Sequence, residues 1–279
     1  MPFAPLAAAI VPMTSSWPFE SNRLPYPRLA CLLFALSTLA NPAWSHPDLL
    51  AQIEDLTAKL LQQPADAGLL VQRGDLYRRH ADYSAAAQDF ATARVIRPDF
   101  PELDFYQGRL RLEVGDAAAA EGLFTHHLAA HPEHAGAWAL RAQARLGLEH
   151  AEAAAEDYAQ AIRRSTNPSP SLYRLQILAL VAAGEQHWQA AREVVDTGLD
   201  RFPREVSLLG LGTDIALAEN LPVVATGYIE TLPAALIKLA RWQSRLELSR
   251  CLSEKLPDTE VSSPACLQVA INTLQEQRP

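Results

Sequence analysis

The sequence repeats with a period of 34 residues, and this period limits the possible folds more than any other feature. Three segments of this length follow one another without a gap: Ala67–Phe100, Pro101–His134 and Ala135–Pro168. All three carry small residues at positions 8 and 20 and a large ring at position 24. These are Gly74, Gly108 and Ala142, then Ala86, Ala120 and Ala154, then Phe90, Phe124 and Tyr158. Position 32 holds Pro98, Pro132 and Thr166.

The residue types at these positions indicate a pair of antiparallel helices in each segment. Small residues at positions 8 and 20 allow the two helices to approach closely, and the ring at position 24 fills the gap to the next repeat. Proline near the end of the second helix stops that helix and sets the turn that follows. Abundant alanine and sparse β-branched residues also favour helices over strands.

This pattern resembles the tetratricopeptide repeat (TPR) family. The segment from Leu70 to Tyr77 (LVQRGDLY) begins the match, which continues at Ala86, Phe90, Ala93 and Pro98. The second repeat departs from the motif at Asp104 and Arg111, and the third departs at Ala142 and Arg145. The resemblance implies an all-α, right-handed solenoid of helical hairpins.

We expect four parts along the chain. Residues 1–45 form a leader with a signal peptide, 46–66 an N-terminal capping helix, 67–203 an array of about four repeats, and 204–279 a degenerate repeat with C-terminal capping helices. The fourth repeat carries two or three inserted residues near Gly184. The fifth unit, at 205–232, has lost the signature of its second helix, and 233–256 and 264–277 form the final helical pair.

The amino-terminal segment has the order of a secretory signal peptide. Arg23 and Arg28 precede the apolar run Leu29–Leu39, and small residues follow up to Ser45. The run is too short to span a bilayer comfortably, which takes about 20 residues. We therefore expect cleavage near Ser45, a periplasmic or secreted protein, and no stable membrane span in the mature form. An uncleaved anchor is the alternative.

Composition and motifs exclude several classes of function. The chain has 32 acidic and 24 basic residues, a net charge of −8, which argues against a general nucleic-acid binder. It contains no nucleophile elbow, zinc-protease motif, phosphate-binding loop or dinucleotide fingerprint. We therefore expect a protein that is not an enzyme and needs no cofactor.

The TPR resemblance implies a concave groove lined by the first helix of each repeat. Arginines there can pair with carboxylates, and an aromatic side chain can anchor an apolar group. The carboxylate clamp of the chaperone-binding members is not expected, because its asparagine is absent. The predicted function is a non-catalytic scaffold or adaptor in the cell envelope that binds a peptide or protein partner. The candidate contact residues are Val71, Asp75, Arg78, Arg79, Phe105, Arg109, Leu112 and Gln143. The alternative for this face is plain solvation.

Four histidines fall within nine residues: His126, His127, His131 and His134. Two or three imidazoles are able to hold zinc or copper, so the alternative function is a metal-binding or metal-handling accessory protein. His127, His131 and His134 are the candidate ligands. The competing interpretation is that these side chains are solvated and favour the carboxyl end of a helix by their partial positive charge.

Cys251 and Cys266 are the cysteines that remain after signal cleavage. An exported compartment permits oxidation, and the two residues flank the loop between the last two expected helices. We predict a disulfide between them, with two buried free thiols as the alternative. The sequence leaves the partner and the oligomeric state open.

Overall fold

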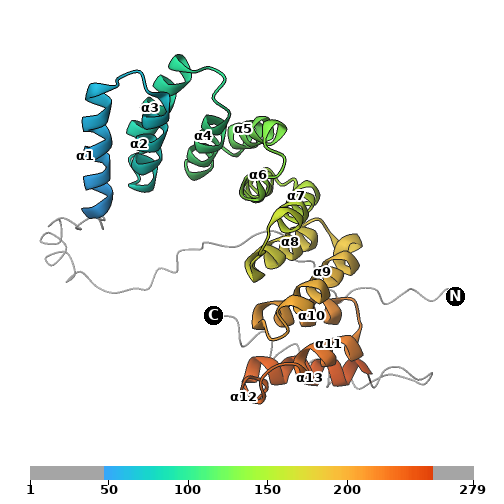
Figure 1. Ribbon diagram of the computed structural model, residues 1–279. Coiled ribbons are helices and arrows are strands. Elements are labelled where there is room, and N and C mark those ends of the chain that lie inside the picture. Colours follow the sequence, from blue (N-terminus) through green and yellow to red (C-terminus); the bar gives the residue numbers. More distant parts are fainter. Residues whose placement is uncertain (1–46, 254–279) are drawn as a thin grey trace, which may run out of the picture. The chain divides into compact units, whose positions relative to one another are not determined.

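The computed structural model describes residues 47–253, which form helices and turns without a strand in that range (Figure 1). The first nine helices are α1 (Pro47–Gln62), α2 (Ala67–Arg79), α3 (Tyr83–Ile96), α4 (Pro101–Glu113), α5 (Ala117–Ala130), α6 (Ala135–Gly147), α7 (Ala151–Arg164), α8 (Pro170–Ala182) and α9 (Trp188–Arg201). They are followed by α10 (Val206–Ala218), α11 (Pro222–Glu230), α12 (Ala234–Ile237) and α13 (Ala240–Ser253).

Each 34-residue segment folds into one helical hairpin, as predicted. The pairs α2–α3, α4–α5 and α6–α7 begin at Ala67, Pro101 and Ala135, the first residues of the three aligned segments. The carboxylates of Asp82 and Asp116 accept backbone N–H groups and so cap the second helix of the first two hairpins. The insertion predicted near Gly184 is a short 3₁₀ helix, η1 (Glu185–His187), between α8 and α9.

The small and large positions of the motif pack against each other inside each hairpin. A Cβ atom added to Gly74 would lie 2.5 Å from the Phe90 ring, and one added to Gly108 would lie 2.8 Å from the Phe124 ring. Gly212 faces the Tyr228 ring of α11 in the same way. The fifth unit therefore keeps the ring at position 24, although Val224 and Thr231 stand where the first repeat has alanine at positions 20 and 27.

The first helices of the hairpins form one layer of the stack. Helix α2 contacts α4, α4 contacts α6, and α8 contacts α10, while the second helices follow on the other side (Figure 1). A side chain on the groove side of a first helix can therefore contact the first helix of the neighbouring repeat. Such a contact reduces the exposure of that side chain to solvent.

The same ion pair holds the first and the third hairpin together. In the first, Arg73 donates to both carboxylate oxygens of Asp89, at 2.8 and 2.7 Å. In the third, Arg141 makes the same two contacts with Asp157, at 2.8 and 2.7 Å. We call this contact the intrarepeat ion pair. The second hairpin has Gln107 and Leu123 at these positions and so lacks it.

The remaining guanidinium nitrogen of each pair bonds to the helix before it. Arg73 donates to the hydroxyl of Thr57 in α1 at 3.1 Å, and Arg141 donates to that of Thr125 in α5 at 3.2 Å. Helix α1 therefore stands where a second helix of a preceding repeat would stand. Its apolar residues Leu49, Ile53 and Leu56 are buried, and they cluster with Leu76 of α2.

The carboxyl-terminal part differs from the expectation of one helix over 233–256. A four-residue helix, α12, ends at Ile237, and α13 begins at Ala240. The side chain of Gln243 donates to the carbonyl of Ile237 at 2.6 Å, which satisfies a backbone group that the break leaves free. The second helix of the predicted final pair, at 264–277, lies outside the described residues, as does the leader.

No helix among residues 47–253 combines the length and the apolar character needed to cross a bilayer.

Candidate functional site

The predicted groove arginines are largely engaged with neighbouring acidic residues. Arg78 pairs with Asp75 on its own helix at 2.8 Å and with Glu113 of α4. Arg109 of α4 reaches Asp75 at 3.5 Å. Two cationic and two anionic groups therefore neutralise one another between α2 and α4.

Two of the predicted contact residues are buried, so their assignment as partner contacts is wrong. Arg78 is 5% exposed, because α4 covers it and supplies Glu113. Val71 is 3% exposed and packs in the apolar core with Leu70 and Leu103. The position of a residue on its own helix does not show how closely the first helix of the next repeat approaches, and this approach buries Arg78.

The other predicted contact residues remain at least partly accessible. Arg79 and Gln143 are exposed. The half-buried ones are Asp75, Phe105, Arg109 and Leu112.

Phe105 forms one wall of an open depression of about 650 Å³, which we call the Phe105 pocket. Helix α4 supplies one side, and the end of α5 with the α5–α6 turn supplies the other. The lining residues are Glu102, Phe105, Tyr106, His127, Ala130, His131, Pro132, Glu133 and His134. The pocket therefore joins two features that the sequence presented separately, the groove aromatic residue and the histidine cluster.

Rings meet at close range in this pocket. The centroid of Phe105 lies 4.5 Å from that of His134 and 5.4 Å from that of His127. Tyr106 stands edge-on to Phe105 at 5.5 Å. Nε2 of His127 and Nδ1 of His134 are hydrogen-bonded at a distance of 2.7 Å.

His127 occupies a place that small residues hold in the other repeats. Position 27 carries Ala93 in the first repeat and Ala161 in the third, and both are fully buried. His127 is 3% exposed at the same position, so an imidazole stands where the other hairpins have a methyl group. This column of the alignment would have identified the pocket. Tyr106, which also lines the pocket, has no such signal in the sequence.

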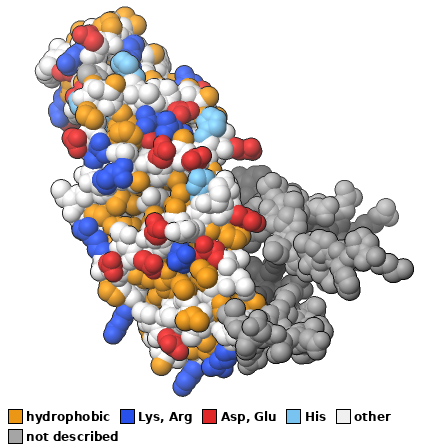
Figure 2. Space-filling model, turned by 90° about the vertical axis from the view of Figure 1, so that its right-hand side faces the viewer, with side chains coloured by type: hydrophobic (Ala, Val, Ile, Leu, Met, Phe, Trp, Pro, Cys, Tyr) orange, Lys and Arg blue, Asp and Glu red, His pale blue; other side chains and the backbone are white. Residues whose placement is uncertain are grey.

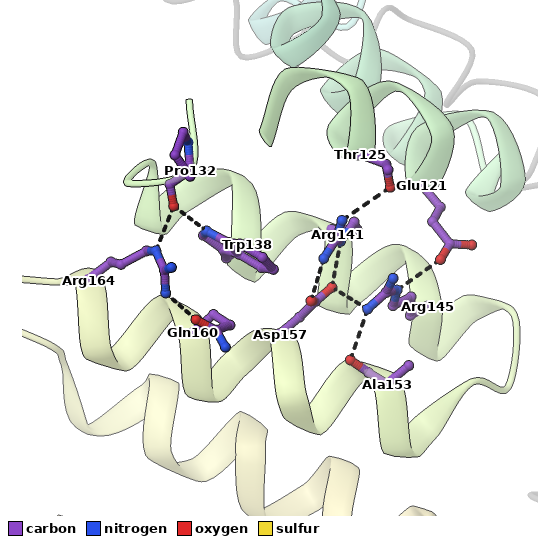
Figure 3. Close-up of polar contacts among 10 residues, drawn as sticks. All are labelled: Glu121, Thr125, Pro132, Trp138, Arg141, Arg145, Ala153, Asp157, Gln160 and Arg164. Carbon is purple, nitrogen blue, oxygen red and sulfur yellow. Dashed lines mark hydrogen bonds and ion pairs between the residues drawn. The ribbon is translucent and has the colours of Figure 1, made fainter. Parts of the chain in front are cut away.

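The α5–α6 turn that borders the pocket is fixed from the far side (Figure 3). The carbonyl of Pro132 accepts the indole N–H of Trp138 at 2.8 Å and the Nε–H of Arg164 at 2.6 Å. The guanidinium carbons of Arg141 and Arg164 lie 4.6 and 5.0 Å from the Trp138 ring. These contacts give the pocket a rigid wall.

Solved structures with the same arrangement of hairpins were found by comparison. YrrB, described as a TPR protein with an unusual peptide-binding site, shares 13% identity and superimposes with a TM-score of 0.57 over 72% of this chain and 99% of its own. PilF of Pseudomonas aeruginosa shares 15% identity with a TM-score of 0.55, over 72% of this chain and 90% of its own. A tetratricopeptide repeat protein from Parabacteroides merdae shares 18% identity, with a TM-score of 0.51 over 82% and 93%.

The chain has the TPR fold. No protein-family model and no curated protein matches the sequence. At the sequence identities of these solved structures, the similarity defines the fold alone. The all-α solenoid predicted from the 34-residue period is confirmed.

Two departures from the TPR motif have structural explanations. Asp104 replaces an apolar residue and is 3% exposed, but its carboxylate bonds to Arg94 and to Nδ1 of His126. Arg145 replaces a second apolar residue of the motif. Its guanidinium contacts the carboxylate of Glu121 of α5 at 2.8 Å and that of Asp157 at 3.0 Å. Each charge therefore has an opposite charge beside it, as a buried charge requires.

The predicted metal site is not borne out in the part of the chain that the structure describes. Among residues 47–253, no group of three or more potential ligands is placed to hold a metal ion. His126 turns away to Asp104, and the facing nitrogens of His127 and His134 bond to each other and leave no room for an ion between them. Burial, followed by the charges of His127 and His131, lowers the pKa of His134, so its ring is neutral at pH 7.

The two carboxylate side chains that line the pocket belong to Glu102 and Glu133, and no lysine or arginine of the described residues lines it. Glu102 and Glu133 are exposed at its edge, and the Glu133 carboxylate lies 3.7 Å from Arg164. The face of the molecule in Figure 2 shows acidic and basic side chains interspersed, without a broad patch of one sign.

Cys251 lies in α13, is 4% exposed and is disulfide-bonded. Its predicted partner Cys266 lies outside the described residues, so the pairing stays a prediction.

Proposed function

We propose that this chain is a non-catalytic binding scaffold that holds a peptide or protein partner against its layer of first helices. One observation carries the proposal. The Phe105 pocket leaves the rings of Phe105, Tyr106 and His134 half-buried in an open depression, beside a turn that Trp138 and Arg164 hold in place. Partly exposed aromatic residues beside a rigid wall are typical of interaction hot spots.

The polar surroundings support this proposal. The four charges between α2 and α4 already pair with one another, so they hold the groove floor in place. Because these side chains are already held in place, they lose less conformational entropy when a partner binds. The solved TPR protein YrrB, described as having a peptide-binding site, has the same fold.

We propose further that the scaffold acts in the cell envelope after export. The support is the order of basic flank, apolar run and small residues that ends near Ser45. Fractionation of cells and amino-terminal sequencing of the purified protein test this part. The expected result is an envelope protein that begins at or near His46, and an intact amino terminus in the cytoplasm would contradict it.

Site-specific photo-crosslinking in living cells tests the scaffold itself. A photoreactive amino acid replaces Leu112 or Gln143 on the first-helix face, and Thr92 on α3 serves as the control. Gln143 and Thr92 are exposed, and Leu112 is half-buried beside the cluster that contains Phe124. We expect a discrete crosslinked adduct from the first-helix positions and none from Thr92. Absence of an adduct at every position, or adducts only from Thr92, would overturn the proposal.

A further inference from the structure

We propose that the Phe105 pocket receives the side chain of an arginine from an extended segment of the partner protein. This inference rests on the proposed binding function and names the chemistry of its partner.

The walls of the pocket suit a planar cation. Phe105 and Tyr106 present aromatic rings, and a guanidinium stacks on such faces when it lies within about 6 Å of the centroid. The chain itself uses this contact, with Arg97 over Phe100 at 4.5 Å. Ala130 and Pro132 offer apolar surface for the methylene stem of the same side chain.

The edge of the pocket supplies the complementary charge. Glu102 stands on α4 and Glu133 on the α5–α6 turn, so the two carboxylates flank the opening from opposite sides. Within residues 47–253, no lysine or arginine lines the pocket. Arg164 lies 3.7 Å from Glu133, and at an exposed site such a contact is weak enough for a partner cation to compete.

The cations nearest the pocket do not fill it. Arg109 lies 5.7 Å from the Phe105 centroid and so makes this contact with the ring, but it is not among the lining residues of the pocket and also pairs with Asp75. Arg78 is buried with Asp75 and Glu113. An acidic partner would therefore find Arg78 and Arg109 already paired, whereas a basic partner meets two carboxylates at the edge of the pocket. The net charge of −8 of the chain also favours a basic partner over an acidic one.

The experiment uses the full chain and a library of N-acetylated hexapeptide amides with randomised residues. The strongest peptide is then measured by calorimetry, together with a copy in which citrulline replaces each arginine in turn. Citrulline keeps the shape of arginine and removes its charge. We expect enrichment of arginine at one position, and at least tenfold weaker binding of the matching citrulline peptide.

Variants of the protein locate the contact. Phe105→Leu keeps an apolar side chain and removes the π face, and the double variant Glu102→Gln, Glu133→Gln removes the carboxylates at exposed positions. Each should weaken binding of the arginine peptide about tenfold while the helical circular dichroism signal is retained. The matched control is Glu54→Gln with Glu156→Gln, which changes the same charge at exposed sites on α1 and α7 and should leave binding unchanged.

The outcomes separate this inference from the proposed function. Peptides that bind through acidic or apolar residues, or a citrulline copy that binds equally well, would overturn the inference and leave the scaffold standing. Equal loss of binding in the control variant would also overturn it, because a general charge effect would then explain the preference. If no peptide binds, the inference fails, and the crosslinking experiment decides the proposed function by itself.

Discussion

The second repeat differs from its two neighbours at the positions that hold a hairpin together. The first and third repeats carry the intrarepeat ion pairs Arg73–Asp89 and Arg141–Asp157, and a buried alanine at position 27. The second repeat has neither feature and places His127 at position 27. The same fold therefore carries an intrarepeat ion pair in two repeats and a pocket lined by aromatic rings in the one between them.

This difference shows how a repeat array acquires a site. The neighbouring hairpins supply rigidity, because the third one fixes the α5–α6 turn through Trp138 and Arg164. The second hairpin places the larger side chain of His127 at a position that alanine fills in its neighbours. It also lacks the intrarepeat ion pair, and Arg94 and His126 instead bond to the buried carboxylate of Asp104 and connect α3, α4 and α5.

The largest expected effect comes from breaking the ion pair of the third repeat. Asp157→Ala leaves the guanidinium of Arg141, a buried residue, without its carboxylate and also removes a contact to Arg145. Removing one partner of a buried pair costs about 3–5 kcal/mol. Urea unfolding, followed by circular dichroism, measures this loss in the free energy of unfolding. Asp55→Ala, which breaks the exposed pair with Lys59, is the control and should cost less than about 0.5 kcal/mol. Equal losses would refute the structural role of the intrarepeat pair.

A second comparison concerns the contact between glycine and the ring at position 24. A new Cβ would meet the Phe90 ring at 2.5 Å in Gly74→Ala and the Phe124 ring at 2.8 Å in Gly108→Ala. Overpacking of this kind costs about 1–3 kcal/mol, and the helix gains up to about 1 kcal/mol from alanine. We therefore expect Gly74→Ala to destabilise the protein more than Gly108→Ala. The reverse order in thermal unfolding would show that the second hairpin is the tighter one.

The period predicts the hairpins because its constraints are local and recur. Gly74 with Phe90 and Gly108 with Phe124 repeat one steric requirement, so the fold follows from the alignment. The site was only partly predictable. Phe105 and the histidines were each singled out, but their meeting depends on how α4 approaches the α5–α6 turn. Val71 and Arg78 were misassigned because their burial depends on neighbouring helices and not on their own face.

A smaller effect is expected at the turn inside each hairpin. This turn has a positive φ at Ala81 (64°), Gly115 (82°) and Glu149 (63°), a backbone conformation that costs most residues about 1 kcal/mol and glycine little. We expect Gly115→Ala to lower the free energy of unfolding by about 1 kcal/mol and Glu149→Gly to raise it by a few tenths to 1 kcal/mol. Chemical denaturation of both variants checks the signs, and two changes of the same sign would contradict this account.

The smallest expected effect is the pH dependence that His134 contributes. Its pKa in the folded protein lies below the unfolded value of 6.5, first because of burial and then because of His127 and His131. The unfolded chain therefore binds the proton more readily, so this contribution is fully present above pH 6.5 and is lost as pH falls through the folded pKa. Between about pH 7 and pH 5, the melting temperature of the wild type should fall further than that of His134→Gln. Parallel pH profiles would rule out this contribution.

Amide hydrogen exchange, with and without the peptide selected from the library, tests most directly whether the second repeat is the binding site. The account predicts that slowed exchange is confined to the start of α4, the end of α5 and the α5–α6 turn. The matching segments of the first and third repeats should exchange at unchanged rates. Protection spread evenly over α2, α4 and α6, or protection that spares the α5–α6 turn, would contradict it.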